Sequence, residues 1–427
     1  MHSPKKYNKI CLLIILNIFF TLLLPLKINA ATEDLEIYAP SCILMEAETG
    51  KILYERNAYN QMFPASTTKV MTAILTLENC NLSDVATVSY SAIHNVPYTY
   101  STSALQEGEE LTINDLLHVL LIPSANDAAF VLAEHIAGSV DAFSDMMNQK
   151  AVEIGCKSTH FVNPNGIHDD NHYSTAYDLA LMGQYAMKNS TFRKIVATTS
   201  YSLPTTNKYD KTDRVFRTTN DLLKSSTSTY YQYATGAKTG YTEAAQNCII
   251  ATATKNDIDL IVVILHDEKT EEGLNTRALD CKTLFEYGFN NYSNRAILSS
   301  GDIATNIVVI GASKDTKNLD LKVAEDIKMF LPNDYDLDSI QPEINLNSSI
   351  TAPIAENTIL GTVTYTIGGT SITSNLLAAN DVLLEENIVI IIKIVAIMIA
   401  LFLIVLLLRI IKKLDNPSDK SKKQSRR

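Results

Sequence analysis

The sequence predicts an α+β protein with an antiparallel sheet and helices, followed by a small all-β domain and a C-terminal membrane helix. Three observations predict this class. Strand-like and helix-like apolar periodicities alternate through the first two thirds of the chain, short strand-like pieces split by glycine, proline and asparagine follow them, and an unbroken apolar run stands near the C-terminus. A length of 427 residues allows two or three domains.

The N-terminal 30 residues have the pattern of a secretory signal peptide. Three lysines precede an apolar run at 10–24, and residues 28–30 resemble a cleavage site. We therefore expect residues 1–30 to be a signal peptide. The alternative is an uncleaved anchor helix.

The first domain is expected to span 31–292. Residues 35–57 predict a hairpin around Glu48-Thr49-Gly50, and the apolar spacing after Ser66 predicts a buried helix. A second helix is predicted over 112–122; Pro123 ends it, and a further helical pattern follows from Asn126. Ser124-Ala125-Asn126 would then lie in the turn between two helices.

The second part of this domain predicts more of the sheet. The runs "NCIIATATK" and "LIVVILH", joined by Asn256 to Asp259, predict an antiparallel hairpin, with Lys238 to Gly240 on or beside an adjoining strand. A helical pattern over 276–289 follows. Residues 293–381 then predict a small β domain.

The C-terminal run predicts a transmembrane anchor over 387–411. From 394 to 411 the residues are almost wholly apolar, and about 18 residues at ~1.5 Å each reach ~27 Å, close to the thickness of a bilayer core. The basic tail, 412–427, should stay cytoplasmic by the positive-inside rule, which places the body outside. A helix lying on the membrane surface is the alternative, but the run lacks a polar face.

Composition excludes some classes of function. The formal net charge is −11, and the body is more acidic still because many basic residues lie in the two end segments, so nucleic acid is not an expected partner. The cysteines after the leader are scattered and lack CxxC spacing, which indicates neither a zinc site nor a disulfide framework. We expect most of them to be small buried residues.

Three short motifs carry the chemistry. They are S-x-x-K at Ser66 to Lys69, S-x-N at Ser124 to Asn126 and K-T-G at Lys238 to Gly240. Each one alone is weak evidence, since S-x-x-K and S-x-N are common by chance and only K-T-G is rarer, but their joint presence in this order and context is much more specific.

The S-x-x-K spacing suits an activated serine. A hydroxyl is a poor nucleophile until a base takes its proton, and residues three apart on a helix share one face, so Lys69 can reach Ser66. Lys69 must be neutral to act as a base, and its ordinary pKa near ~10.4 has to fall by several units, at ~1.4 kcal/mol each. Burial and a second cation, Lys238, both push the pKa that way.

The other motif residues suit the remaining roles. Ser124 can relay a proton to the leaving amine, and Asn126 can hold Lys69 and the substrate amide. Lys238 and Thr239 offer a cation and a hydroxyl to a substrate carboxylate.

The K-T-G strand also suits substrate binding through its backbone. Gly240 lets a substrate backbone lie flat against the strand. The N–H groups of Ser66 and Tyr241 could form an oxyanion hole. The structural alternatives are that Ser66 and Ser124 only cap helices and that Lys238 and Thr239 are ordinary strand residues.

A rival site would use histidines. His160, His168 and His172 lie near Asp169 and Asp170, which could suggest a metal or a Ser-His-Asp site. No ligand spacing supports either reading, so we expect solvated loop residues and no metal.

At these motifs the chain resembles the serine-type D-alanyl-D-alanine carboxypeptidases, the low-molecular-mass penicillin-binding proteins, whose signature the three motifs match. The resemblance runs from about Leu35 to Asp381 and includes "PASTTKVMTA", "SANDAA", "FVNPNGIHDDNHYSTAYDLA" and "GAKTGYTEAA".

The resemblance implies a β-lactamase/transpeptidase-like fold with a small β domain and a membrane anchor. It implies that the enzyme removes the terminal D-alanine of peptidoglycan stem peptides through an acyl-enzyme on Ser66, with Lys69 as base. It also implies that Ser124, Asn126 and the K-T-G residues complete the site, that β-lactam antibiotics bind covalently, and that no cofactor is needed.

Two departures from the family pattern affect substrate preference. Tyr241 stands where some relatives carry histidine, and the arginine that some members use for the terminal carboxylate has only Arg217 and Arg277 as candidates.

Two other functions stay open. A class A β-lactamase needs a deacylating carboxylate about 35–40 residues after S-x-N; residues 161–166 lack one, although Asp169 and Asp170 are close by. A non-catalytic penicillin-sensing or wall-binding protein would keep the pocket without turnover.

Overall fold

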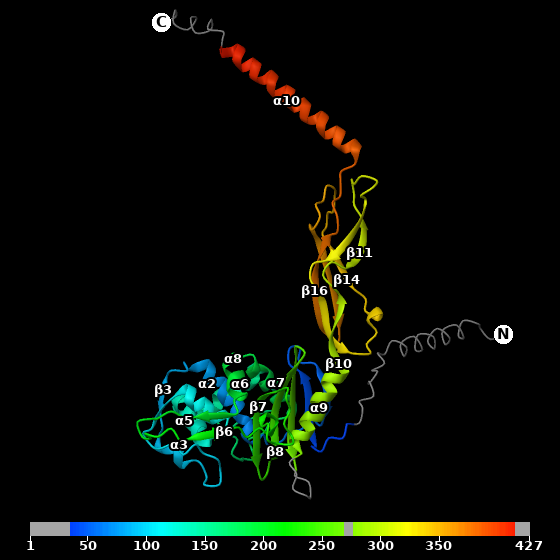
Figure 1. Cartoon of the computed structure of the whole chain (residues 1–427). Coiled ribbons are helices and arrows are strands. Elements are labelled where there is room, and N and C mark those ends of the chain that lie inside the picture. The colour runs from blue at the N-terminus through cyan, green and yellow to red at the C-terminus, as the bar shows by residue number, and fades with distance from the viewer. Residues whose placement is uncertain (1–34, 269–275, 415–427) are drawn as a thin grey trace, which may run out of the picture. The chain divides into compact units, whose positions relative to one another are not determined.

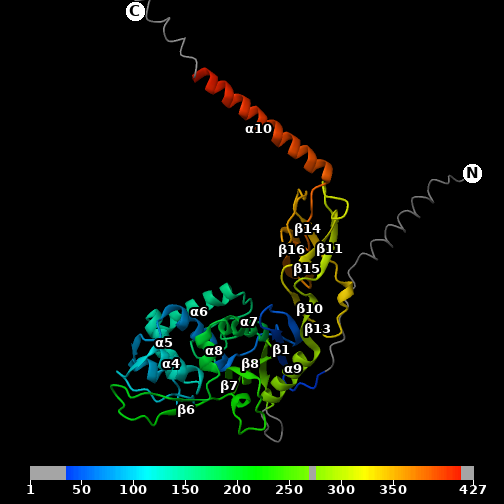
Figure 2. The same ribbon diagram turned by 45° about the horizontal axis from the view of Figure 1, so that its top comes forward.

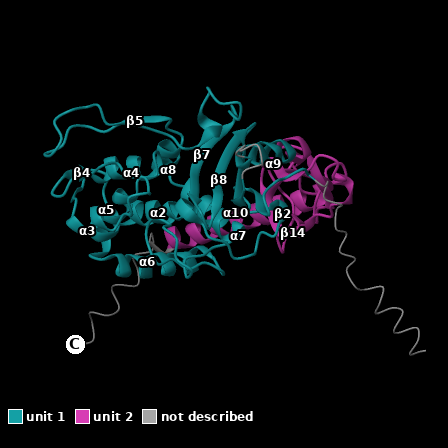
Figure 3. Cartoon of the chain, turned by 90° about the horizontal axis from the view of Figure 1, so that it is seen from below, with its two compact units in different colours: residues 1–288 teal, residues 289–427 magenta. Residues whose placement is uncertain are grey.

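The computed structural model describes residues 35–268 and 276–414. They form two compact units, divided between Gly288 and Phe289 (Figure 3). The expected signal peptide, 1–30, and the residues of the basic tail beyond 414 lie outside the described residues.

A five-stranded antiparallel sheet organises the first unit, in the order β2-β1-β9-β8-β7. Two of its neighbouring strands, β7 and β8, are labelled in Figure 1. Its strands are β1 Ser41–Glu46, β2 Ile52–Arg56, β7 Ala234–Thr242, β8 Gln246–Lys255 and β9 Ile258–Asp267. Both predicted hairpins are confirmed. The β8–β9 connection is shorter than expected, because Lys255 pairs directly with Ile258 and the turn consists of Asn256 and Asp257, both at positive φ.

The helices of the first unit follow the predicted pattern. They are α2 Lys69–Asn79, α3 Tyr90–His94, α4 Ile113–Leu121, α5 Asn126–Ala137, α6 Val140–Ile154, α7 Ala176–Met187, α8 Ser190–Val196 and α9 Arg277–Asn291, with 3-10 turns η1 Ala65–Thr68 and η2 Asp221–Leu223. Two small strand pairs accompany them, β3 Val85–Thr87 with β4 Glu110–Thr112 and β5 Ser200–Ser202 with β6 Val215–Arg217. Thr112 caps α4 by accepting a hydrogen bond from the Asp115 backbone N–H.

The central sheet is covered on both faces. Gly183 of α7 packs against Ile261 of β9, and Gly288 of α9 packs against Leu260, the adjacent residue on the same strand. Because successive strand residues point to opposite faces, α7 and α9 cover opposite faces of the sheet. This double cover explains why β8 and β9 are buried along almost their whole length.

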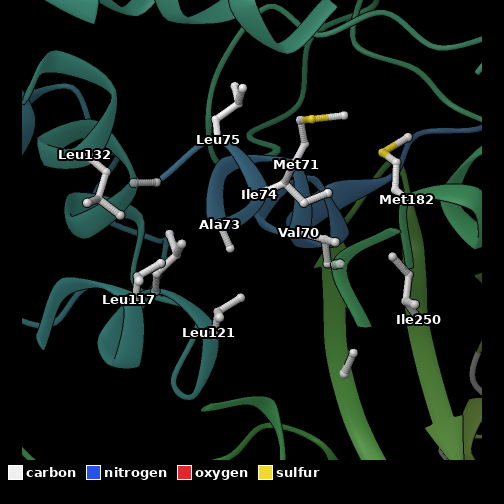
Figure 4. Close-up of a cluster of buried hydrophobic side chains, with 14 of the residues drawn as sticks. Val70, Met71, Ala73, Ile74, Leu75, Leu117, Leu121, Leu132, Met182 and Ile250 are labelled. Atoms are coloured by element: carbon white, nitrogen blue, oxygen red, sulfur yellow. The ribbon is translucent and has the colours of Figure 1, made fainter. Parts of the chain in front are cut away.

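Helix α2 occupies the centre of the first unit. It packs against α4, α5, α6 and α7. Figure 4 shows its side chains between Leu117, Leu121 and Leu132 on one side and Met182 and Ile250 on the other. Every residue from Lys69 to Thr76 is buried, so this part of the helix has no solvent-exposed face. Its side chains are apolar apart from those of Lys69, Thr72 and Thr76.

The second unit begins with a β structure, whose strands include β10 to β16 (Figure 2). It has its own hydrophobic core. Its larger sheet has the order β11-β12-β16-β15-β14, and β10 pairs with β13. The strands are β10 Tyr292–Leu298, β11 Ile303–Val308, β12 Asn318–Val323, β13 Ile327–Pro332, β14 Glu343–Leu346, β15 Ile359–Ile367 and β16 Thr370–Ala378, with the 3-10 turn η3 Leu337–Ser339. Strand β12 alternates exposed and buried residues, as expected for a sheet with one covered face.

One described helix is long and apolar enough to cross a membrane. Helix α10 spans Glu386–Leu414, and within its segment Glu386–Lys412 the most apolar stretch of 18 residues has a mean hydropathy of 3.4. At ~1.5 Å per residue this segment exceeds the ~30 Å of a bilayer core. It contains the predicted span.

Candidate active site

Ser66 and Lys69 lie where a 3-10 turn passes into helix α2. Ser66 belongs to η1, and Lys69 is the first residue of α2. The Thr67 backbone N–H donates to the Pro64 carbonyl at 3.2 Å, which fixes the tight turn. Ser66 is partly accessible, whereas Lys69 is fully buried.

The Lys69 amine has three oxygen neighbours. Its Nζ lies 2.8 Å from Ser66 Oγ, 2.9 Å from Asn126 Oδ1 and 3.0 Å from the Asn165 carbonyl oxygen. Among the described residues no carboxylate is hydrogen-bonded to it. The amine is therefore held without a counter-ion in direct contact.

This environment lowers the pKa of Lys69 well below its usual value. Burial is the largest cause, the positive charge of Lys238 adds to it, and Asp127 opposes both. A lysine that loses its proton readily and touches a serine hydroxyl has the properties of a general base.

The loop at 163–166 supplies the third contact of Lys69. It lies so close to η1 that a Cβ on Gly166, which has φ +82°, would come within 1.8 Å of the Ala65 carbonyl oxygen. The Thr72 hydroxyl donates to the Pro164 carbonyl at 2.5 Å, which ties the loop to α2. Glycine is thus required for the approach that places the Asn165 carbonyl on Lys69.

The S-x-N motif lies between α4 and α5. Asn126 opens α5, and its Nδ2 donates to the Ser101 carbonyl at 2.8 Å, which directs Oδ1 toward Lys69. Ser124 has φ +69°, a conformation that residues other than glycine rarely adopt. Its buried hydroxyl has no hydrogen-bond partner among the described residues.

The K-T-G residues lie on β7 beside the serine. A Cβ on Gly240 would come within 2.9 Å of the Ser66 backbone nitrogen, so only glycine allows this approach. Lys238 is 1% exposed and donates from Nζ to the Thr239 carbonyl at 2.8 Å. The Thr239 hydroxyl is hydrogen-bonded to that of Thr219 at 2.5 Å.

A second cation lies behind the strand. Arg277 is 8% exposed and donates from Nη1 to the carbonyl oxygens of Gly240, at 3.2 Å, and Cys248, at 3.3 Å. Burial lowers the pKa of Lys238 to about 7, and the Arg277 charge contributes to the shift. The other predicted candidate, Arg217, is exposed at the end of β6, and the Tyr241 side chain is also exposed.

The prediction that His172 is a solvated loop residue is wrong. It is 2% exposed; its Nδ1 accepts from the Val162 backbone N–H at 3.2 Å, and its Nε2 lies 2.8 Å from the Thr68 hydroxyl. Burial lowers its pKa to about 3, so it is neutral at ordinary pH. Within 35–268 and 276–414 no group of three His, Cys, Asp or Glu side chains is placed to hold a metal.

The structure thus places the three motifs together around one serine. Lys69 and Asn126 join Ser66 through hydrogen bonds, Gly240 joins it through close packing, and Lys238 acts on Lys69 through its charge. Ser124 and Thr239 belong to the same motifs as Asn126 and Gly240, but neither is hydrogen-bonded to Ser66 among the described residues. The Tyr241 side chain points to solvent, so only its backbone could serve the proposed oxyanion hole.

Sequence reasoning missed three groups that shape the site. They are the Asn165 carbonyl, Ser101, which orients Asn126, and Asp127. The string Asn163-Pro164-Asn165-Gly166 predicts a tight turn, so the turn that carries the Asn165 carbonyl could have been found from the sequence. Nothing in the string indicates that this carbonyl contacts Lys69.

Two family models match the chain. The model for D-alanyl-D-alanine carboxypeptidases matches residues 27–269, and the model for the C-terminal domain of penicillin-binding protein 5 matches residues 292–383. Together they cover most of both units.

Individual relatives agree with this result. The D-alanyl-D-alanine carboxypeptidase DacF of Bacillus subtilis is 30% identical over 369 residues, which cover 85% of this chain and 90% of the relative. The structure of penicillin-binding protein 5 from Haemophilus influenzae is 29% identical, covers 82% of this chain and 98% of its own, and has a TM-score of 0.59. A DD-transpeptidase from Streptomyces is 33% identical, covers 60% of this chain and 98% of its own, and has a TM-score of 0.55.

Proposed function

Because the chain belongs to the D-alanyl-D-alanine carboxypeptidase family, we propose that Ser66 and Lys69 are the nucleophile and base with which it removes the terminal D-alanine of peptidoglycan stem peptides. The chain is a serine-type peptidase of the penicillin-binding class. Our proposal assigns the individual catalytic and binding roles to residues of this chain.

The hydrogen bonds of Lys69 carry the proposal. A neutral amine has two N–H groups and one lone pair. Asn126 Oδ1 and the Asn165 carbonyl can only accept, so they take the two N–H groups and leave the lone pair for the Ser66 hydroxyl, 2.8 Å away. The contacts therefore fit a neutral lysine that withdraws the serine proton.

The reaction then proceeds in two halves. Ser66 Oγ attacks the carbonyl carbon between the two D-alanines while its proton passes to Lys69. The amide C–N bond breaks, and D-alanine leaves with a proton relayed through Ser124. Water next attacks the ester on Ser66 and releases the shortened peptide.

Backbone and side-chain donors serve the substrate in this scheme. The N–H groups of Ser66 and Tyr241 would stabilise the negative oxygen of the tetrahedral intermediate. Lys238 and Thr239 would bind the terminal carboxylate, and Asn126 the substrate amide. Arg277, buried against Gly240, raises the positive potential there and is a better candidate than the exposed Arg217.

β-Lactam antibiotics are expected to acylate the same serine. The β-lactamase alternative requires a deacylating carboxylate, and the nearby acids do not supply one: Asp169 accepts from the Asn171 backbone N–H at 2.8 Å, Asp170 is paired with His168 at 3.5 Å, and both acids are exposed. A penicillin adduct should therefore persist.

Transpeptidation is a second candidate. The likeness to a Streptomyces DD-transpeptidase favours it, because an amine can replace water in the second half-reaction. Added amino acceptor would then give a transfer product at the expense of hydrolysis.

We also propose the domain limits and topology that the sequence predicts. They are a signal peptide over 1–30, a catalytic domain over 31–292, a β domain over 293–381, a transmembrane segment over 387–411 and a basic cytoplasmic tail over 412–427. The apolar helix α10 is compatible with an anchor that leaves the catalytic domain outside the cell.

One experiment tests the proposal. The full-length protein in detergent should release D-alanine from diacetyl-Lys-D-Ala-D-Ala and should become labelled by a fluorescent penicillin. Ser66→Ala should abolish both activities. Persistent labelling of the Ser66 variant would refute the assignment, whereas labelling without D-alanine release by the unmodified protein would indicate a penicillin sensor.

A further inference from the structure

Asp127 is a buried carboxylate that follows Asn126 in the first turn of α5. It is 2% exposed. Both of its oxygens accept from the Ser103 backbone N–H at 3.0 Å, and they also accept from the Ser103 hydroxyl at 3.1 Å, the Leu105 N–H at 3.2 Å and the Ala128 N–H at 2.9 Å. Asp127 lies outside the S-x-x-K, S-x-N and K-T-G residues, although it directly follows Asn126.

These contacts favour the ionised form of Asp127. Its backbone partners are all N–H donors, so a proton on the carboxyl group would find only the Ser103 hydroxyl to accept it and would otherwise displace an N–H. No cation within the described residues is hydrogen-bonded to it. The positive end of the α5 dipole further favours the negative charge. Burial opposes ionisation and raises the pKa.

The segment that Asp127 holds also orients the site. Residues 103 and 105 are bound to Asp127, and Ser101, two residues earlier, binds the S-x-N motif. The Ser101 carbonyl accepts from Asn126 Nδ2 at 2.8 Å and from the Asn126 N–H at 2.9 Å, while the Ser101 hydroxyl donates to the Ser124 carbonyl at 2.9 Å. Loss of the carboxylate would loosen the segment that keeps Asn126 Oδ1 on Lys69.

We infer that Asp127 is a positioning residue, which holds the 101–105 segment against the S-x-N motif and supplies the negative charge that keeps Lys69 a strong enough base. The inference rests on the proposed role of Lys69 in taking the Ser66 proton.

The charges around Lys69 determine whether Asp127 raises or lowers the pKa of the Lys69 amine. Burial and Lys238 lower the pKa of Lys69, and Asp127 raises it. A lysine whose pKa falls too far would be neutral but would accept the serine proton weakly, because base strength falls with pKa. The nearby His172 has a pKa of about 3 and stays neutral over the working range, so Lys238 and Asp127 are the opposing charges that decide the balance.

The test is the pH profile of acylation by penicillin, measured with the full-length protein. Its acid limb reports protonation of Lys69, which abolishes the base. Asp127→Asn removes the negative charge, lowers the pKa of Lys69 and should move the acid limb to lower pH by about one unit. The acylation rate on the plateau should fall by about tenfold or more.

Two matched variants separate charge from structure. Ser103→Ala removes one hydrogen bond to Asp127 and keeps the charge, so the limb should stay in place. Asp127→Glu also keeps the charge and should leave the limb within a few tenths of a unit, even if the rate falls. Melting curves check that each variant is folded, and the Glu variant retains the test if the Asn variant fails to fold.

Three outcomes would overturn the inference. The limb could move to higher pH in Asp127→Asn, as expected if the change only admits water to Lys69. It could remain in place in Asp127→Asn, or it could move to lower pH in Asp127→Glu despite the retained charge. A limb that persists in Lys69→Met would instead show that the proposed base is wrong, so the two failures are distinguishable.

Discussion

The two compact units bury different kinds of side chain, and the difference shows where the chemistry lies. In the first unit Lys69, Lys238, Asp127 and Arg277 are all at most 8% exposed. In the described part of the second unit, Ser374 is the one buried polar residue, and the core consists of aliphatic and aromatic side chains.

Burial of charge is costly, whereas an apolar core stabilises a fold directly. Removing a buried charged or polar group without function would often stabilise a protein or leave its stability unchanged. The buried charges around Ser66 therefore have a chemical benefit, whereas others in the first unit bind structural partners, as Glu109 binds Arg214 and Asp280 binds the Ala39 N–H. The second unit follows the simpler rule of a sheet with one covered face, which suits a structural module. The following predictions test this contrast.

The largest effect is expected at Lys69. Lys69→Met replaces a buried amine by an apolar side chain of similar length, and kcat/KM for D-alanine release should fall about 10³-fold through loss of the base. The melting temperature should change little, because loss of the desolvated amine offsets the hydrogen bonds that Asn126 Oδ1 and the Asn165 carbonyl lose. The matched control is Lys322→Met in β12, which removes an exposed ion pair with Glu356 at 3.1 Å and should leave kcat/KM unchanged. A large loss of stability in the Lys69 variant would contradict the contrast.

The converse effect is expected at Leu321, which is fully buried in the core of the second unit. Leu321→Ala should destabilise that unit by about 2–5 kcal/mol. Hydrogen exchange followed by mass spectrometry reads the two units separately. On a soluble tripeptide kcat/KM should stay within about twofold, because the residue contacts nothing in the site. A proportional loss of activity would show that the two units are coupled.

A smaller but sharper comparison uses two glycines at similar positive φ. Gly166 has φ +82° and Gly301, in the second unit, has φ +92°, but an added Cβ meets the Ala65 carbonyl oxygen at 1.8 Å in the first and nothing within 4 Å in the second. Both alanine variants should lose about 1–2 kcal/mol to backbone strain. Gly166→Ala should lose about 2 kcal/mol more through the clash, together with activity. Equal losses in urea unfolding would show that the loop at 163–166 relaxes freely.

The elements of the first unit and the three motifs could be predicted because both depend on patterns among residues that are close in the sequence. A serine and a lysine three residues apart on a helix face must be neighbours, and the runs either side of Asn256 and Asp257 could only pair as a hairpin. The prediction of the turn was too long because Ile258 and Asp259 already belong to the strand.

The parts of the site that were not predicted have no such local pattern in the sequence. Every residue carries a carbonyl group, so nothing in the sequence distinguishes that of Asn165 as a partner of Lys69. Asp127 reads as an ordinary acid in the first turn of a helix, and its link to residues 101–105 spans a long connection. His172 was misjudged because its loop is polar in sequence, although tertiary packing buries the ring against Thr68.

The smallest predicted effect concerns the charge of Lys238. Burial and Arg277 lower its pKa to about 7, so the free enzyme loses this positive charge as the pH rises through about 7. If Lys238 binds the substrate carboxylate, kcat/KM should decline severalfold between about pH 7 and pH 9, since fewer molecules carry the charge. The bound carboxylate favours the protonated amine, so kcat should decline only at higher pH than kcat/KM.

Lys238→Arg sharpens this test because a guanidinium stays charged throughout the range. The alkaline decline of kcat/KM should disappear or move to higher pH in this variant, although the larger group could lower the plateau. The measurement is the initial rate of D-alanine release at low tripeptide concentration from pH 6 to pH 10. If the unmodified enzyme kept a constant kcat/KM to pH 9, the buried lysine of β7 would not act through its charge, and the buried cations of the first unit would need separate explanations.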